Sequence, residues 1–136
     1  MLEEYIKKVQ IEARVMGDLA STYILPAAIK YQNVLLNNIK GLKDAGLDKK
    51  LFANQLDIVT KISEHINIIA DKTEAMIAAR KSANEIADIR AKAIAYCDDI
   101  KGKFFDDIRY NVDKLELMVD DSYWTLPKYR EILFLR

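Results

Sequence analysis

The chain offers few side chains that could act as catalysts or metal ligands. It contains a single histidine, His65, and a single cysteine, Cys97. A histidine can bind a metal ion or transfer a proton near neutral pH. However, His65 lies at helical spacing from several isoleucines, with Glu64 beside it, and the sequence contains no second histidine. We therefore interpret His65 as a structural histidine at the boundary of a helix packing face.

Three aspartate doublets are the other candidates for chemistry: Asp98-Asp99, Asp106-Asp107 and Asp120-Asp121. Carboxylate oxygens are good ligands for divalent cations, so a cation site is one interpretation. Adjacent residues on an α-helix point about 100° apart, which lets each doublet direct at most one carboxylate into a shared site. We favour a solvated face opposite lysine and arginine residues. We predict no catalytic, cofactor-binding or metal-binding residue in this chain.

Composition narrows the class of protein. The 136 residues are 51% hydrophobic, and 21 Lys and Arg balance 21 Asp and Glu. A net charge of zero argues against nucleic acid as a partner, because such binding depends on neutralising phosphates. No apolar run reaches the roughly 18 residues that cross a bilayer, and no signal peptide opens the chain. Cys97 falls on a helical apolar stripe, so we expect it to be buried. A lone cysteine fits a reducing compartment, and we expect a cytoplasmic protein.

The first element that positions these residues is a long helix. Apolar residues recur every three or four positions from Leu2 to Leu42, which is the period of an amphipathic helix. Pro26 lies inside this pattern, and proline both removes a backbone donor and clashes with the preceding turn. We therefore predict one long helix with a kink near Thr22–Leu25.

Two further apolar stripes of the same period follow. We expect the second helix to begin at Asp48, whose side chain can cap the first turn. Ser82-Ala-Asn-Glu85 has the spacing of a capping box. We therefore place a turn near Arg80–Asn84 and begin there a third helix that continues to Val119, with Gly102 as a candidate kink.

These stripes predict the fold class. No segment alternates between polar and apolar residues over the length of a strand. Long amphipathic helices joined by short loops must run up, down and up to bury their stripes against one another. We predict a single all-α domain over residues 1–136, an antiparallel bundle of three long helices with a short C-terminal helix at Leu126–Leu133.

Two groups of side chains are candidates for contacts with a partner. The first is Tyr31 and Asn33, and the second is Trp124, Tyr129 and Phe134. The first group sets amides beside an aromatic ring. Buried amides fix the register of packed helices, and a polar helix edge facing water is an equal alternative. The aromatic residues near the C-terminus either close the open end of the bundle, which we favour, or anchor another subunit.

Several longer strings resemble a known family. They are Glu12-Ala-Arg-Val-Met-Gly-Asp-Leu-Ala20, Leu25-Pro-Ala-Ala-Ile-Lys-Tyr-Gln-Asn33, Ala93-Ile-Ala-Tyr-Cys97, Ile108-Arg-Tyr110, Asp113-Lys-Leu-Glu-Leu-Met-Val-Asp-Asp121 and, after Trp124, Leu126-Pro-Lys-Tyr-Arg-Glu-Ile-Leu-Phe134. In this order the strings cover nearly the whole chain. Together they resemble the C-terminal region of type III glutamine synthetases.

The resemblance implies a fragment of a larger enzyme subunit. The parent would be an ATP-dependent ligase that makes glutamine from glutamate and ammonia, uses magnesium, and assembles into a large ring-shaped homo-oligomer. The family's catalytic groups lie on a sheet-lined domain upstream, so this chain alone is expected to be inactive. Its partners would be that catalytic domain and other subunits, and Met1 would not be a natural start.

The resemblance leaves the role of the domain open among three interpretations. We favour a structural role in which the domain holds subunits together or braces the catalytic body. The first alternative is an independent helical adaptor whose exposed stripe recognises a partner helix. The second is a regulatory lid of the parent enzyme that contacts the active site through one tip of the bundle.

Overall fold

The structure is a computed structural model that describes residues 1–124. Helices joined by short turns account for almost all of this part of the chain, and it contains no strand. The predicted all-α class is therefore confirmed for the described residues. The short helix predicted at Leu126–Leu133 lies outside them.

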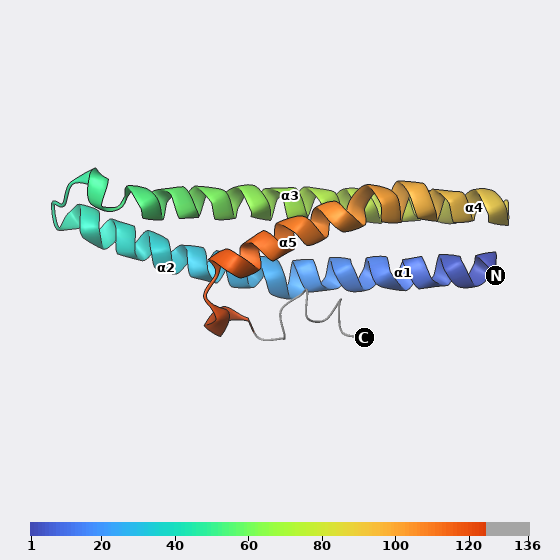
Figure 1. Ribbon diagram of the computed structural model, residues 1–136, viewed down its shortest axis with the longest axis horizontal. Helices are drawn as coiled ribbons and strands as arrows, with labels where there is room; N and C mark the ends of the chain where they lie inside the picture. Colours follow the sequence, from blue (N-terminus) through green and yellow to red (C-terminus); the bar gives the residue numbers. More distant parts are fainter. Residues whose placement is uncertain (125–136) are drawn as a thin grey trace.

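The first helical segment is α1 (Leu2–Leu19), which continues through η1 (Ala20–Ile24) into α2 (Leu25–Asp44). The η1 segment is a wide π turn in which the Leu25 amide donates to the Ala20 carbonyl. Pro26 follows directly, and its ring would clash with the carbonyl of the fourth residue before it in a regular α-helix. The irregularity predicted near Thr22–Leu25 is thus present, and α2 is tilted away from the axis of α1 (Figure 1).

A tight connection reverses the chain after α2. Gly46 has a φ of +78°, a conformation that suits glycine because it lacks a Cβ. The Leu47 amide then donates to the Leu42 carbonyl at 3.2 Å. Asp48 caps as expected, since its Oδ1 accepts from the Lys50 amide at 3.3 Å. The capped element is a short 3₁₀ turn, η2 (Lys49–Leu51), and the long helix α3 (Ala53–Asn84) starts just beyond it.

The second reversal differs from the sequence prediction. The prediction that a capping box at Ser82–Glu85 begins the third helix is wrong, because α3 continues through Asn84 and Ser82 belongs to its last turn. The N-cap of α4 (Ile89–Ala95) is Asp88, whose Oδ2 accepts from the Ala91 amide at 2.9 Å. Extending α3 places Ala83 in the core and Asn84 in a hydrogen-bond network, which stabilises the extra turn.

The last long segment joins α4, η3 (Tyr96–Phe105) and α5 (Asp106–Met118) without a break, and a 3₁₀ turn, η4 (Asp121–Tyr123), follows. The candidate kink at Gly102 falls inside η3, which has π geometry. A Cβ at Gly102 would lie only 3.0 Å from the Cys97 carbonyl oxygen, so this close turn favours glycine. The wider turn also lets the neighbouring rings of Phe104 and Phe105 both be buried.

Figure 1 shows how these segments lie against one another. α3 runs back alongside α1 and α2, and the chain then reverses again so that α5 crosses over α3. The core lies along the seam between them. Its largest fully buried side chains include Val9 and Met16 of α1, Ile62, Ile69 and Met76 of α3, and Ile100, Ile108, Val112 and Leu115 of η3 and α5.

The central position of α3 leads to a stability prediction. Ile69 is fully buried, whereas the adjacent Ile68 is 40% exposed. Replacing Ile69→Ala should lower the free energy of unfolding by about 2–5 kcal/mol, because it removes buried methyl groups and leaves a cavity. The matched variant Ile68→Ala should cost much less. Urea unfolding followed by circular dichroism measures both, and equal losses for the two variants would contradict this packing.

Candidate functional site

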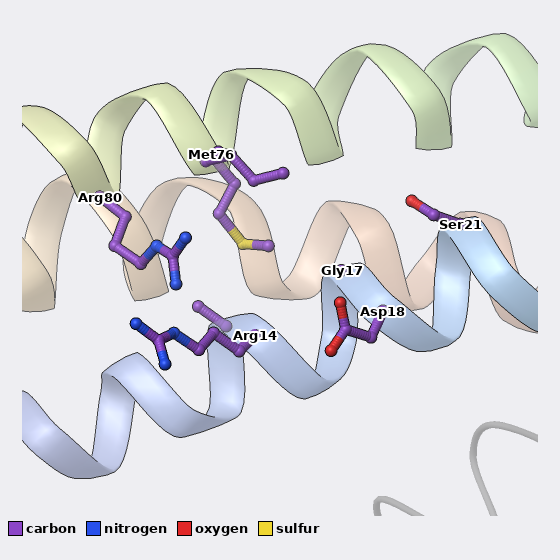
Figure 2. A pocket seen from close by; sticks show the side chains of 8 residues that line it. Arg14, Gly17, Asp18, Ser21, Met76 and Arg80 are labelled. Atoms are coloured by element: carbon purple, nitrogen blue, oxygen red, sulfur yellow. The ribbon is translucent and has the colours of Figure 1, made fainter.

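A cleft lies between α3 and the C-terminal part of α1 (Figure 2). Its volume is about 100 Å³. Apolar side chains and a glycine form part of the wall, and charged and hydroxyl groups form the rest; the residues are Ala13, Arg14, Gly17, Asp18, Ser21, Met76, Ile77 and Arg80. None of these residues was singled out for chemistry from the sequence, because arginines on two different helices carry no signal of meeting.

The two arginines of the cleft face each other. Figure 2 shows the guanidinium groups of Arg14 and Arg80 extending toward one another from α1 and α3, with the carboxylate of Asp18 farther along α1 and the hydroxyl of Ser21 in η1. The Nη1 atom of Arg80 is shielded from solvent and has no hydrogen-bond partner. Within residues 1–124 neither guanidinium forms an ion pair with a carboxylate.

A polar layer borders the cleft and joins three segments. The Oδ1 atom of Asn84 accepts from Gln10 Nε2 at 3.1 Å and from the hydroxyl of Tyr96. Tyr96 is fully buried, and burial raises the pKa of its phenol, although the hydrogen bonds to Gln10 and Asn84 and the charges of Arg80 and Arg14 act in the opposite direction. The layer joins α1, α3 and η3 and gives the hydroxyl of the buried Tyr96 a partner, without which that hydroxyl would cost free energy.

His65 has the structural role expected from the sequence. Its Nδ1 atom lies 2.8 Å from Asn111 Oδ1, while Asn111 Nδ2 donates to the Asp107 carbonyl at 2.7 Å. This network assigns a proton to His65 Nδ1, because the Asn111 oxygen can only accept. The side chains therefore connect α3 to α5 within a partly buried contact.

The prediction that Cys97 is buried is wrong. Cys97 is exposed, and the adjacent Tyr96 takes the inner position instead. The helical period allows either residue to follow Ala93 on the packing face, and the larger ring fills more of the core. A hydrogen bond with the Cys97 side chain, together with partial burial, raises the pKa of Tyr5 from 10.0 to about 12.

The predicted interaction residues lie in different environments. Tyr31 is partly buried, and its ring packs edge-on against Tyr123 with centroids 5.5 Å apart. Asn33 is exposed on α2, and Trp124 is partly buried against the core. Tyr129 and Phe134 lie outside the described residues. Tyr123, which the sequence analysis did not single out, thus brings the region after α5 onto α2.

Other amides on α2 set its register against α3. Gln32 Nε2 donates to the Val59 carbonyl at 3.0 Å and to Ser63 Oγ at 2.6 Å. Asn38 Nδ2 donates to Gln55 Oε1 at 2.6 Å. A register role was one of two interpretations of the amide beside Tyr31, and the α2 side chains that bond to α3 are Gln32 and Asn38.

The outer face of α5 carries two apolar residues that the sequence analysis assigned to no role. Tyr110 is 59% exposed and Leu117, seven residues further on and hence on the same side of the helix, is 65% exposed. The Lys114 ammonium lies between them in sequence, 5.3 Å from the centre of the Tyr110 ring. We refer to Tyr110, Lys114 and Leu117 as the α5 face.

Two kinds of site are absent from residues 1–124. In that part of the chain, no three His, Cys, Asp or Glu side chains lie close enough to hold a metal ion. One member of the aspartate doublets, Asp107, pairs with Lys72 at 3.5 Å. No helix in the same range is long and apolar enough to span a bilayer.

Comparison with known proteins agrees with the resemblance seen in the sequence. A family model described as the glutamine synthetase C-terminal domain matches residues 1–43. The chain is 40% identical over 136 residues to a glutamine synthetase of Bacteroides fragilis (strain YCH46), covering 98% of this chain and 18% of that protein. It is 27% identical over 139 residues to a type-3 glutamine synthetase of Dictyostelium discoideum, covering 100% of this chain and 19% of that protein.

Two conclusions follow from these comparisons. The resemblance of this chain to the C-terminal domain of glutamine synthetases, including the type-3 branch, is confirmed. The chain also spans less than a fifth of the length of the two relatives.

The contact of Tyr5 with Cys97 leads to a prediction about pH. In the unfolded chain the Tyr5 phenol loses its proton near its usual pKa of 10.0, but in the folded protein it does so at about 12. The folded state therefore binds this proton more tightly, and its stabilising contribution, complete below pH 10, is lost as the pH rises through 12. Tyr5→Phe should make the fall in stability above pH 10 shallower than in the unmodified chain.

Urea unfolding at several alkaline pH values measures this slope. Tyr110→Phe is the control, because Tyr110 is exposed and should leave the slope unchanged. If Tyr5→Phe and Tyr110→Phe give the same pH dependence as the unmodified chain, the contact between Tyr5 and Cys97 does not hold the proton in solution.

Proposed function

We propose that this chain is the C-terminal structural domain of a type III glutamine synthetase and that it holds subunits of the enzyme together. The observation that carries the proposal is the extent of the match: nearly all of this chain aligns with proteins named glutamine synthetase, of which it covers less than a fifth. The parent would be a cytoplasmic glutamate–ammonia ligase that uses ATP and magnesium. Residues 1–136 would form one domain, an antiparallel bundle of three long helices with a short C-terminal helix.

The α5 face supports a subunit contact. Leu117 and Tyr110 remain mostly exposed although every neighbouring apolar position of α5 contributes to the core. Burying an apolar side chain of this size is worth about 1.5–3 kcal/mol, and tyrosine is a frequent anchor of protein interfaces. In this proposal the α5 face packs on another subunit. Among the described residues of the sequence-predicted surface, Asn33 on α2 is exposed and open to such a contact.

Assembly of the full-length enzyme tests the proposal. Leu117→Glu places a charge in the proposed contact, so we expect the enzyme to form smaller particles in mass photometry and to lose activity in parallel. Lys101→Glu, which alters an exposed position of η3, is the control and should assemble normally. Normal assembly of Leu117→Glu, with unchanged activity, would contradict a role of the α5 face.

The adaptor interpretation is tested by the size of the protein in the cell. An antibody against residues 49–61 should detect a band several times larger than the 15.6 kDa of this chain. A single band near 15.6 kDa would mean that the chain is made alone, which favours an independent helical adaptor over a domain of an enzyme subunit.

The isolated chain should lack enzymatic activity under this proposal. Glutamine synthesis requires clustered metal ligands and cationic groups around the transferred phosphoryl group, and the family's catalytic groups are expected upstream. Calorimetric titration of the 136-residue chain with ATP and magnesium should therefore show no saturable binding tighter than about millimolar, which corresponds to about −4 kcal/mol. Tighter binding would favour the regulatory interpretation instead.

A further inference from the structure

The opposed arginines of the α1–α3 cleft are not balanced by the protein around them. Arg14 and Arg80 extend toward each other, and neither forms an ion pair with a carboxylate in residues 1–124 (Figure 2). Like charges that approach each other raise the energy of the folded state, and the effect increases where water is excluded. The Nη1 atom of Arg80 is both shielded from solvent and without a partner. A buried donor in that state destabilises the fold, and more so when it is charged.

Neighbouring groups do not remove this cost. Asp18 contributes a carboxylate to the cleft wall, but it is exposed and forms no ion pair with either arginine. The Asn84 oxygen, one helical turn beyond Arg80, already accepts two hydrogen bonds, from Gln10 and Tyr96. The charges of both arginines also act on the Tyr96 phenol and favour its ionised form, so their field extends into the core. The charged residues of the wall sum to one net positive charge.

The cleft has the size and lining of a small ligand site. Its volume of about 100 Å³ compares with about 30 Å³ for one water molecule in the liquid. That space accepts a phosphate ion or the carboxylate end of a small organic acid, but it does not enclose a whole nucleotide. Ala13, Met76 and Ile77 supply an apolar wall, and the Ser21 hydroxyl is a further donor.

We propose that a small oxyanion, a phosphate or a carboxylate of a free small molecule, binds between Arg14 and Arg80 in the α1–α3 cleft. Guanidinium groups hold such oxyanions through paired hydrogen bonds in a planar fork. The ligand provides the acceptor that Arg80 Nη1 lacks and separates the two like charges. It also links α1 to α3 across their packing seam, which stabilises the bundle. The proposal concerns this chain alone and does not depend on its assignment to glutamine synthetase.

Titration of the 136-residue chain tests the proposal. Inorganic phosphate and L-glutamate are added in separate series, each against sodium chloride of equal ionic strength, and followed by ¹H–¹⁵N correlation spectra and by thermal unfolding. At least one probe should give saturable shifts at the backbone amides of residues 13–21 and 76–80 and should raise the melting temperature. Saturation with phosphate alone identifies a phosphate site, and saturation with glutamate alone identifies a carboxylate site.

Variants connect the response to the two arginines. Arg14→Gln and Arg80→Gln should each weaken binding at least tenfold. Arg80→Lys keeps the charge but loses the planar fork, so its affinity should fall between those of the unmodified chain and Arg80→Gln. Lys101→Gln removes a positive charge from an exposed position of η3 and should leave binding unchanged.

Three results would overturn the proposal. These are the absence of saturation with either probe, an equal response to sodium chloride, and binding that the arginine variants leave unchanged. If Arg80→Gln does not fold, Arg14→Gln decides the question, because Arg14 is exposed and its loss leaves the core intact.

Discussion

The structure depends on the burial of one narrow apolar edge of α3. Ile62, Ile69 and Met76 follow one another at intervals of seven residues and are almost completely shielded from solvent. α3 contacts α1 and α2 as well as η3 and α5, so this helix provides the surface on which the other segments pack (Figure 1). An isolated α3 would have no partner for this edge, and the helices are therefore stable mainly through their mutual packing.

Two wide turns, η1 and η3, rotate the helical segments that follow them so that their apolar side chains pack against this edge of α3. Apolar residues at intervals of seven drift around a regular α-helix by about 20° per repeat. η1 and η3 each alter the rotation of the helix locally, and the side chains that follow them return to the seam. Pro26 and Gly102 stand where these turns occur, the first because its ring disrupts the regular helix and the second because it permits a close approach to a carbonyl. These two turns therefore keep apolar side chains on the buried seam along the length of the helices.

Some polar side chains fix the packing of the helices, and others line the α1–α3 cleft. Gln32, Asn84 and Asn111 form hydrogen bonds between helices, which penalise any shift in register. Arg14 and Arg80 instead line the α1–α3 cleft, and within residues 1–124 neither forms an ion pair with a carboxylate. The α5 face, by contrast, exposes the apolar side chains of Tyr110 and Leu117 with Lys114 between them.

The sequence by itself determined the helical class, the irregularity before Pro26 and the cap at Asp48, because apolar period, proline geometry and capping act within a few neighbouring residues. The resemblance to glutamine synthetases also came from the sequence alone, because it rests on matching strings of residues. Tertiary structure decided where α3 ends, that Tyr96 rather than Cys97 is buried, and that Arg14 and Arg80 meet. Each of these outcomes depends on side chains contributed by other helices. A local pattern allows either of two adjacent residues to be buried, or a helix to end at either of two positions, at almost equal free energy. Only packing against segments distant in the sequence selects one of them.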